Sequence, residues 1–169
     1  MSEKLFQRTQ YHDVTIYSSK VVFTFTHNQK EWPLYLSVAQ ILLRENNARF
    51  VDKDHAIGFE LKNHEVVDML ATLLRYRENY QTGVHKGKKL EITHQHERPE
   101  GPFLLKFFYD LNVANCPVPQ SLVMELVCLL LRHLYRCHPH IPSKDYVAVL
   151  GKVYSRETKE FCVSPSPLK

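Results

Sequence analysis

The stretch Lys20-Val21-Val22-Phe23-Thr24-Phe25-Thr26-His27 decides the fold, because alternate side chains along it share one character. Val21, Phe23 and Phe25 would lie on one face of a strand, and the residues between them on the other. The β-branched and aromatic residues of this stretch favour strands. Val14 to Tyr17 has the same composition, and Ser18-Ser19 between the two segments predicts a hairpin turn. The sequence therefore predicts an antiparallel pair of strands near its start.

Two further strand pairs are expected downstream. The first joins Ala48–Val51 to His55–Leu61 through a turn at Asp52 to Asp54, and the second joins Lys88–Gln95 to Phe103–Tyr109 through Arg98 to Gly101. Each of the three pairs is followed by a segment with helical spacing of its apolar residues.

The three expected helices have recognisable starts. Pro33 suits the first turn of a helix that runs to about Asn46, and Asn63 can cap a second that ends near Asn79. Pro117 and Pro119 precede the third helix, Gln120 to Cys137. All three carry Leu-Leu-Arg near their ends, at residues 42–44, 73–75 and 130–132, so the sequence indicates a strand-strand-helix unit used three times, although chance recurrence of a common tripeptide remains the alternative. A short last helix, Tyr146 to Leu150, should stop at Gly151.

These elements predict one α+β domain over residues 1–163, with a flexible tail at 164–169. Antiparallel hairpins would form one curved sheet, and the three main helices would cover one of its faces. A chain of 169 residues is long enough to bury one core and too short for two ordinary domains.

Charge and cysteine content bound the class of protein. Lys and Arg total 22 against 18 Asp and Glu, so the formal net charge of +4 is modest for a protein that would hold a polyanion by charge alone. Four irregularly spaced cysteines argue against a disulfide scaffold. No apolar run at the start resembles a signal peptide, and Leu122–Leu131 is too short to span a bilayer. We expect an intracellular protein, cytoplasmic or nuclear, without membrane association.

The sequence contains no diagnostic reaction motif. The phosphate-binding glycine loops, the G-x-S-x-G turn and the H-E-x-x-H zinc motif are all missing, and only five glycines are available to build a phosphate-cradling loop. We therefore expect no catalytic residue and no cofactor, with hydrolytic or transfer chemistry as a minor alternative.

A weak metal-ligand pattern occurs at the end of the third helix. His133 and Cys137 are four residues apart and could face one Zn²⁺ ion, with His140 folding back as a third ligand. His94 and His96 could converge on the same place. The alternative is an ordinary helix end, where His and Arg favour the negative end of the dipole. We favour that alternative and expect no bound metal.

A basic segment beside aromatic strands predicts nucleic-acid binding. Lys86, Lys88, Lys89 and Arg98 could contact phosphates, and Tyr17, Phe108 or Tyr109 could stack on bases. Phe107 and Phe108 are adjacent, so they cannot both point inward from a regular strand. The alternative for the lysines is a solvated hairpin turn. If one face of the sheet stays open, it would hold a single strand of DNA or RNA.

The expected order of strands and helices is similar in outline to the sheet-and-helix modules of Whirly-type single-strand binders. The similarity rests on element order and assigns no role to any residue. It implies a non-enzymatic protein that binds single-stranded nucleic acid on the sheet.

A rival hypothesis rests on the helix Gln120–Cys137, which is apolar nearly all round. Both of its sides should be covered, either by other elements of this chain or by a twin copy in a homodimer. The protein would then be an interaction or assembly subunit that works through this helix or through a free strand edge.

Overall fold

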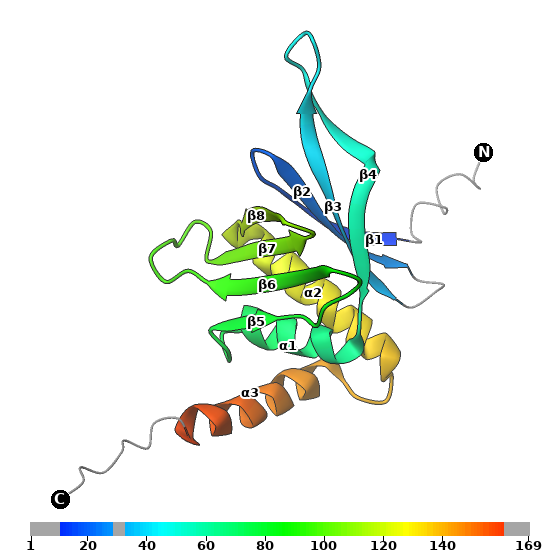
Figure 1. Ribbon diagram of the computed structural model, residues 1–169. Coiled ribbons are helices and arrows are strands. Elements are labelled where there is room, and N and C mark those ends of the chain that lie inside the picture. The colour runs from blue at the N-terminus through cyan, green and yellow to red at the C-terminus, as the bar shows by residue number, and fades with distance from the viewer. Residues whose placement is uncertain (1–10, 29–32, 161–169) are drawn as a thin grey trace, which may run out of the picture.

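In the computed structural model, which describes residues 11–28 and 33–160, four strands and a helix are followed by four strands and two helices (Figure 1). The first group is β1 (Tyr11–Tyr17), β2 (Val21–Asn28), β3 (Leu34–Leu43), β4 (Arg49–Leu61) and α1 (Asn63–Leu73). The second is β5 (Asn79–Gln81), β6 (Lys88–His94), β7 (Phe103–Tyr109), β8 (Asn112–Val118), α2 (Gln120–Cys137) and α3 (Ser143–Glu160).

Each group of strands forms an antiparallel sheet in which neighbours in the chain are neighbours in space. Sheet A has the order β1-β2-β3-β4, and sheet B has the order β5-β6-β7-β8. The expected pairing of the first two strands is confirmed, with Val14 opposite Phe25 and Ile16 opposite Phe23. The expected α+β class built of antiparallel hairpins is confirmed as well, but with two sheets in place of one.

The apolar core lies where the inner faces of both sheets meet each other and the helices. Phe107 of β7 contacts two rings of sheet A, meeting Phe23 edge-on at 6.4 Å between centroids and stacking on Phe59 at 5.8 Å. All three rings are buried. In Figure 1, α2 runs behind β6 and β7, so the helical layer covers one side of sheet B and leaves its other side bare.

The predicted helix from Leu34 to Asn46 is wrong, because the segment forms β3 between β2 and β4. Leu34, Leu36 and Val38 are buried in alternation with Tyr35 and Ser37, which is the two-residue period of a strand. The register shifts between Val38 and Gln40, which is the mark of a β-bulge. The apolar residues Leu34, Val38, Ile41 and Leu42 are also spaced as on one face of a helix, so local spacing alone did not distinguish a strand from a helix here.

The predicted turn at Asp52 to Asp54 is also wrong, because β4 continues from Arg49 to Leu61; its pairing with β3 shifts register between Asp52 and Ile57, but the chain does not reverse there. The chain reverses earlier, where the Arg44 N–H donates to the Ala48 carbonyl at 2.9 Å and Asn47 has φ 61°. β3 and β4 consequently extend beyond the rest of the molecule as a long hairpin arm, at the top of Figure 1. The repeated unit is therefore four strands and a helix used twice.

Two strands, β5 of three residues and β8 of seven, had no counterpart in the expected layout. The strand β5 could form because α1 ends at Leu73, six residues before the predicted end. Arg75 then has φ 62°, and the three residues of β5 pair with β6.

The strand β8 contains Pro117, and proline lacks the N–H that a central strand needs for pairing on both sides. Because β8 is the edge strand of sheet B, the missing N–H is tolerated there.

The last helix is longer than predicted, because Gly151 does not stop it. α3 passes through Gly151 close to Tyr76, and a Cβ at that glycine would lie 3.2 Å from the Tyr76 hydroxyl oxygen. Asp68 of α1 holds this region together by accepting hydrogen bonds from Arg77, at 2.8 Å, and from the Tyr154 hydroxyl. The glycine therefore permits close packing within a continuous helix.

The third expected helix is confirmed with the predicted bounds, Gln120–Cys137, but only one of its faces is buried. Met124 and Tyr135 are 61% and 45% exposed, so the expectation that both sides are covered is wrong for the single chain. No helix in the described part of the chain is long and apolar enough to cross a membrane. The predicted tail at 164–169 lies outside the described residues.

Phe107 and its neighbour Phe108 allow a matched test of this core. Phe107→Ala should lower the free energy of unfolding by about 3–5 kcal/mol, because it removes a fully buried ring that joins the two sheets. Phe108→Ala removes the same atoms from the outer face and should cost less than half as much. Urea denaturation of both variants measures the difference, and equal losses would contradict this packing.

Candidate nucleic-acid interface

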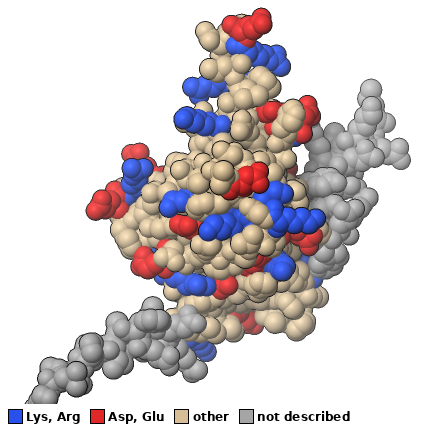
Figure 2. Space-filling model, viewed as in Figure 1, with Lys and Arg blue, Asp and Glu red and all other residues tan. Residues whose placement is uncertain are grey.

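The outer face of sheet B carries a lysine stacked on an aromatic ring. Lys89 of β6 and Phe108 of β7 are directly opposite each other, and the Lys89 ammonium lies 4.5 Å from the centre of the Phe108 ring. On the same face, Lys106 is held by Glu91 at 3.3 Å. Phe108 is half-buried and Phe107 fully buried, as the alternation of strand side chains requires. In Figure 2, Lys and Arg side chains spread across the middle of the view, over the strands of sheet B.

Lys86 lies in a tight turn that leads into β6. His85 and Lys88 exchange backbone hydrogen bonds of 2.7 and 3.1 Å, and Lys86 and Gly87 between them have φ 50° and 79°. Two residues with positive φ are typical of a two-residue hairpin turn, and glycine suits the second position. Lys86 is exposed in this turn, so the alternative of a solvated hairpin describes its surroundings correctly.

The turn borders a cavity of about 570 Å³ between sheet A and sheet B, which we call the junction pocket. Its lining is Tyr35, Gly58, Phe59, Glu60, Lys62, His85, Lys86 and Lys88. The Lys88 ammonium donates to the Gly58 carbonyl at 3.3 Å and so reaches from sheet B to β4. Three lysines and one glutamate give the pocket an excess of positive charge.

A buried carboxylate fixes the two sides of the junction pocket. Glu65, 1% exposed, accepts hydrogen bonds from the backbone N–H of Lys62 at 2.9 Å and of Gly83 at 3.0 Å. Glu65 also accepts a hydrogen bond of 2.8 Å from His85 Nε2. The His85 ring in turn stacks on Phe59 of sheet A, with 4.3 Å between the ring centres. Burial alone would raise the pKa of Glu65, but the hydrogen bonds outweigh it and hold the pKa below its usual value.

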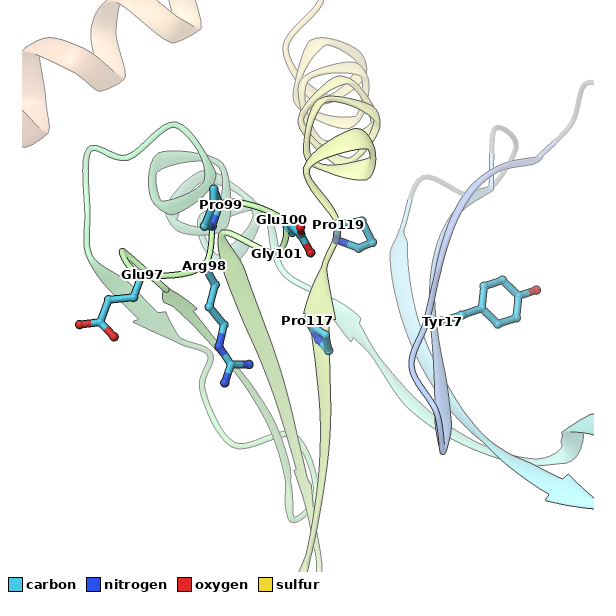
Figure 3. A pocket seen from close by; sticks show the side chains of 8 residues that line it. All are labelled: Tyr17, Glu97, Arg98, Pro99, Glu100, Gly101, Pro117 and Pro119. Atoms are coloured by element: carbon cyan, nitrogen blue, oxygen red, sulfur yellow. The ribbon is translucent and has the colours of Figure 1, made fainter.

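Three of the predicted site residues lie apart from these surfaces. Tyr17 and Arg98 line another cavity, of about 470 Å³, and Figure 3 shows Pro117 standing between them. Glu97 and Glu100 line the same cavity, which offsets the charge of Arg98. The Tyr109 ring turns toward Phe107, 5.8 Å away, on the inner side of β7. The structure therefore brings Lys86 and Lys88 together at one surface and Lys89 and Phe108 at another, joined through β6.

Sequence reasoning missed Tyr35 and Lys62, which line the junction pocket, and Lys106 on sheet B. Tyr35 is 43% exposed and faces outward between Leu34 and Leu36. The signal that could have found it was the alternation of buried and exposed residues from 34 to 38, had that segment been read as a strand.

The weak metal pattern at the end of α2 is not assembled as a three-ligand group in the described residues. His133 Nε2 and the Cys137 thiol both donate to Asn63 Oδ1, at 2.9 and 3.5 Å. His140 instead lies near His138, with 6.2 Å between ring centres. Burial lowers the pKa of His133, which is 1% exposed and packs edge-on against His27 at 5.2 Å. His133 therefore behaves as a neutral core residue.

Comparisons with known proteins establish a likeness of fold. No protein-family model and no curated protein matches this sequence. Among solved structures, the chain is similar to one described as Trypanosoma brucei MRP1/MRP2, with 14% identity and a TM-score of 0.55 over 80% of this chain and 95% of that one. It is also similar to WHY1 from Arabidopsis thaliana, with 15% identity and a TM-score of 0.50 over 94% of this chain and 97% of that one. At these identities the likeness concerns the fold alone.

Removal of the Glu65 charge should loosen the junction pocket. Glu65→Gln leaves buried donors poorly satisfied and should lower the free energy of unfolding at pH 7 by about 1–3 kcal/mol. Because its pKa is lowered in the folded protein, the carboxylate stabilises the fold above its usual pKa of 4.5, and this contribution is lost as the pH falls through the lowered value. Urea denaturation from about pH 3 to about pH 7 measures both effects, because this range spans the ordinary pKa of a glutamate carboxyl group.

The exposed Glu60→Gln variant is the control, since Glu60 lines the same pocket without being buried. A Glu65→Gln protein as stable as the Glu60→Gln protein at neutral pH would show that the buried carboxylate does not hold the pocket together.

Proposed function

We propose that this protein binds single-stranded nucleic acid without catalysing a reaction, on the outer face of sheet B and in the junction pocket. The observation that carries the proposal is the Lys89–Phe108 pair beside a pocket lined by Lys62, Lys86 and Lys88. Ammonium groups would contact phosphates, while Phe108 and Tyr35 offer rings on which bases can stack.

The strand β6 makes the two surfaces neighbours. Successive side chains of a strand point to opposite faces, so Lys89 stands on the outer face of sheet B while Lys88 reaches to Gly58 of β4. A flexible single strand can turn from one surface to the other between adjacent phosphates. A rigid duplex would need a longer uniform surface, which favours single-stranded ligands.

The local arrangement matters more than the total charge. The net charge of +4 is too small to hold a polyanion over the whole surface, and Lys106 is already paired with Glu91. Binding would therefore depend on the lysines of sheet B and the junction pocket that form no ion pair among the described residues, which are Lys62, Lys86, Lys88 and Lys89. Arg98 and Tyr17 would lie at the periphery of the bound ligand.

The fold supports the same proposal. The likeness to MRP1/MRP2 and WHY1 is a likeness of architecture, and the order of elements resembles that of Whirly-type single-strand binders. An intracellular place of action, cytoplasmic or nuclear, belongs to the proposal, and the free thiols of Cys116, Cys128 and Cys137 are compatible with a reducing compartment.

Fluorescence anisotropy with a labelled single-stranded oligonucleotide tests the proposal. Phe108→Ala should weaken binding at least about fivefold, since one stacked base contributes ~1–3 kcal/mol. Lys86→Ala with Lys89→Ala should lower the slope of log affinity against log salt by about 0.7 per lysine. A double variant of two exposed cations on the helices, Arg132→Ala with Lys144→Ala, is the control and should bind almost as the unaltered protein does.

Two results would overturn the proposal. One is the lack of salt-dependent binding at low ionic strength. The other is an equal loss of affinity in the sheet variants and in the helix control, which would indicate non-specific attraction to positive charge.

A second candidate function, assembly with another copy of the chain, is favoured by the exposed side of α2. Met124, Cys128 and Tyr135 lie on this side, and partly buried Leu131 continues the row. Their spacing of four, three and four residues is that of a helical packing seam. The seam faces away from the sheets, so self-association and nucleic-acid binding are compatible. A two-fold axis would bring the seam against itself.

Light scattering during gel filtration tests self-association. If the seam of α2 pairs with a second copy, Met124→Lys with Tyr135→Lys should shift the protein to a 19.9 kDa monomer. Val113→Lys is the matched control, because Val113 is 50% exposed on the edge strand β8. A monomer before any substitution, or an unaltered oligomer in the double variant, would exclude this assembly.

A further inference from the structure

Three metal-ligating side chains meet at the end of β6 that lies farthest from the Lys86 turn. They are Glu78, His94 and His96, and one potential ligand atom from each lies within 4.8 Å of the others. Neither the interface described above nor the α2 seam uses any of them. The cluster therefore needs an explanation of its own.

The backbone of sheet B brings the three residues together. The His94 N–H donates to the Glu78 carbonyl at 2.9 Å, which continues the pairing of Asn79 with Thr93 by one residue. His96 follows His94 by two residues, and the Gln95 N–H between them is held by the Pro102 carbonyl at 2.7 Å. The chain turns after His94, and the contacts between the side chains show that both imidazoles lie beside the carboxylate.

The side chains already contact one another. His96 Nε2 lies 2.7 Å from Glu78 Oε2, and the rings of His94 and His96 meet edge-on with 4.3 Å between centres. His94 is half-buried against Phe103, whereas Glu78 and His96 are exposed to solvent. A solvated ion can consequently enter with little rearrangement.

The surroundings of the cluster include one further charged side chain, Arg75. Arg75 would repel a bound cation, but its side chain is exposed, so water screens this repulsion.

We propose that Glu78, His94 and His96 form a binding site for a divalent transition-metal ion of the Zn²⁺ class. Two imidazoles and a carboxylate are donors that Zn²⁺ accepts, and water would complete a tetrahedral set. Mg²⁺ and Ca²⁺ require mainly oxygen ligands and would bind poorly. The site departs from the sequence-based expectation of no cofactor. His94 and His96 do not converge on His133, Cys137 and His140 as considered from the sequence, but group with Glu78 instead.

A bound ion would fasten the loop after β6 to the start of β5. This loop, residues 95–102, carries Arg98 and lines the cavity that it shares with Tyr17. The ion would therefore act as a structural clamp at one end of sheet B. This role does not depend on nucleic-acid binding.

Zn²⁺ titration of the untagged full chain, followed by competition with a chromophoric chelator, tests the site. The unaltered protein should take up one tightly bound Zn²⁺ per chain, and Mg²⁺ should not compete. His94→Ala with His96→Ala should weaken Zn²⁺ affinity at least about tenfold, and Glu78→Gln should weaken it in the same direction. Co²⁺ absorption in the visible region should report tetrahedral coordination in the unaltered protein and not in the His94→Ala, His96→Ala variant.

His55→Ala is the matched control. Exposed His55 pairs with half-buried Asp52, with 2.9 Å between Nδ1 and Oδ2, but no third ligand joins them in the described residues. This variant should bind Zn²⁺ as the unaltered protein does.

Zn²⁺ affinity that survives in the His94→Ala, His96→Ala protein, or falls equally in the His55→Ala protein, would overturn the proposal. Far-UV circular dichroism shows whether each variant is folded, and Glu78→Gln, an exposed and isosteric change, keeps the test valid if the double variant unfolds. Oligonucleotide binding is measured separately, so failure of this proposal and failure of the proposed function are distinguishable.

Discussion

The contact of Phe107 with Phe23 and Phe59 is the interaction on which the rest of the structure depends. These three buried rings join β7 to β2 and β4, and so hold one four-stranded sheet against the other. Aromatic rings bury large apolar areas, and such contacts prefer the edge-on and offset geometries seen here. With the sheets fixed in this way, the helices α1 and α2 close the remaining inner side, and no other element of the described residues covers the outer face of sheet B (Figure 1).

The same contact determines where chemistry is available. Because β4 and β6 are brought together beside the core, the Glu65 carboxylate can reach both His85 and the backbone at Lys62, and the junction pocket forms between the sheets. Along β6 and β7, the side chains that alternate with the buried ones point to the outer face of sheet B and are partly exposed to solvent. The Phe107 ring is buried in the core, whereas the ring of its neighbour Phe108 contacts the Lys89 ammonium on the outer face. Strand alternation thus separates the packing residues from the proposed binding residues.

Much of this organisation could be predicted from the sequence, and the failures have physical causes. The alternation at residues 20–27, the bounds of α2 and the division of roles between Phe107 and Phe108 follow from periodicity, which local sequence carries. The strand β3 does not, because its burial pattern depends on pairing with β2 and β4, while its apolar residues are also spaced as on one face of a helix. Tyr35 was not predicted as a site residue because its segment was expected to be a helix rather than a strand. Glu65 could not be found either, since its partner His85 is twenty residues away.

Photocrosslinking of a single-stranded oligonucleotide, followed by mass spectrometry of the attached peptides, tests the central claim most directly, because it locates the ligand without altering the protein. The account predicts crosslinks to the peptides that contain Phe108 of β7 and Tyr35 of β3, on the outer face of sheet B and at the junction pocket. Crosslinks confined to α2 and α3 would contradict it.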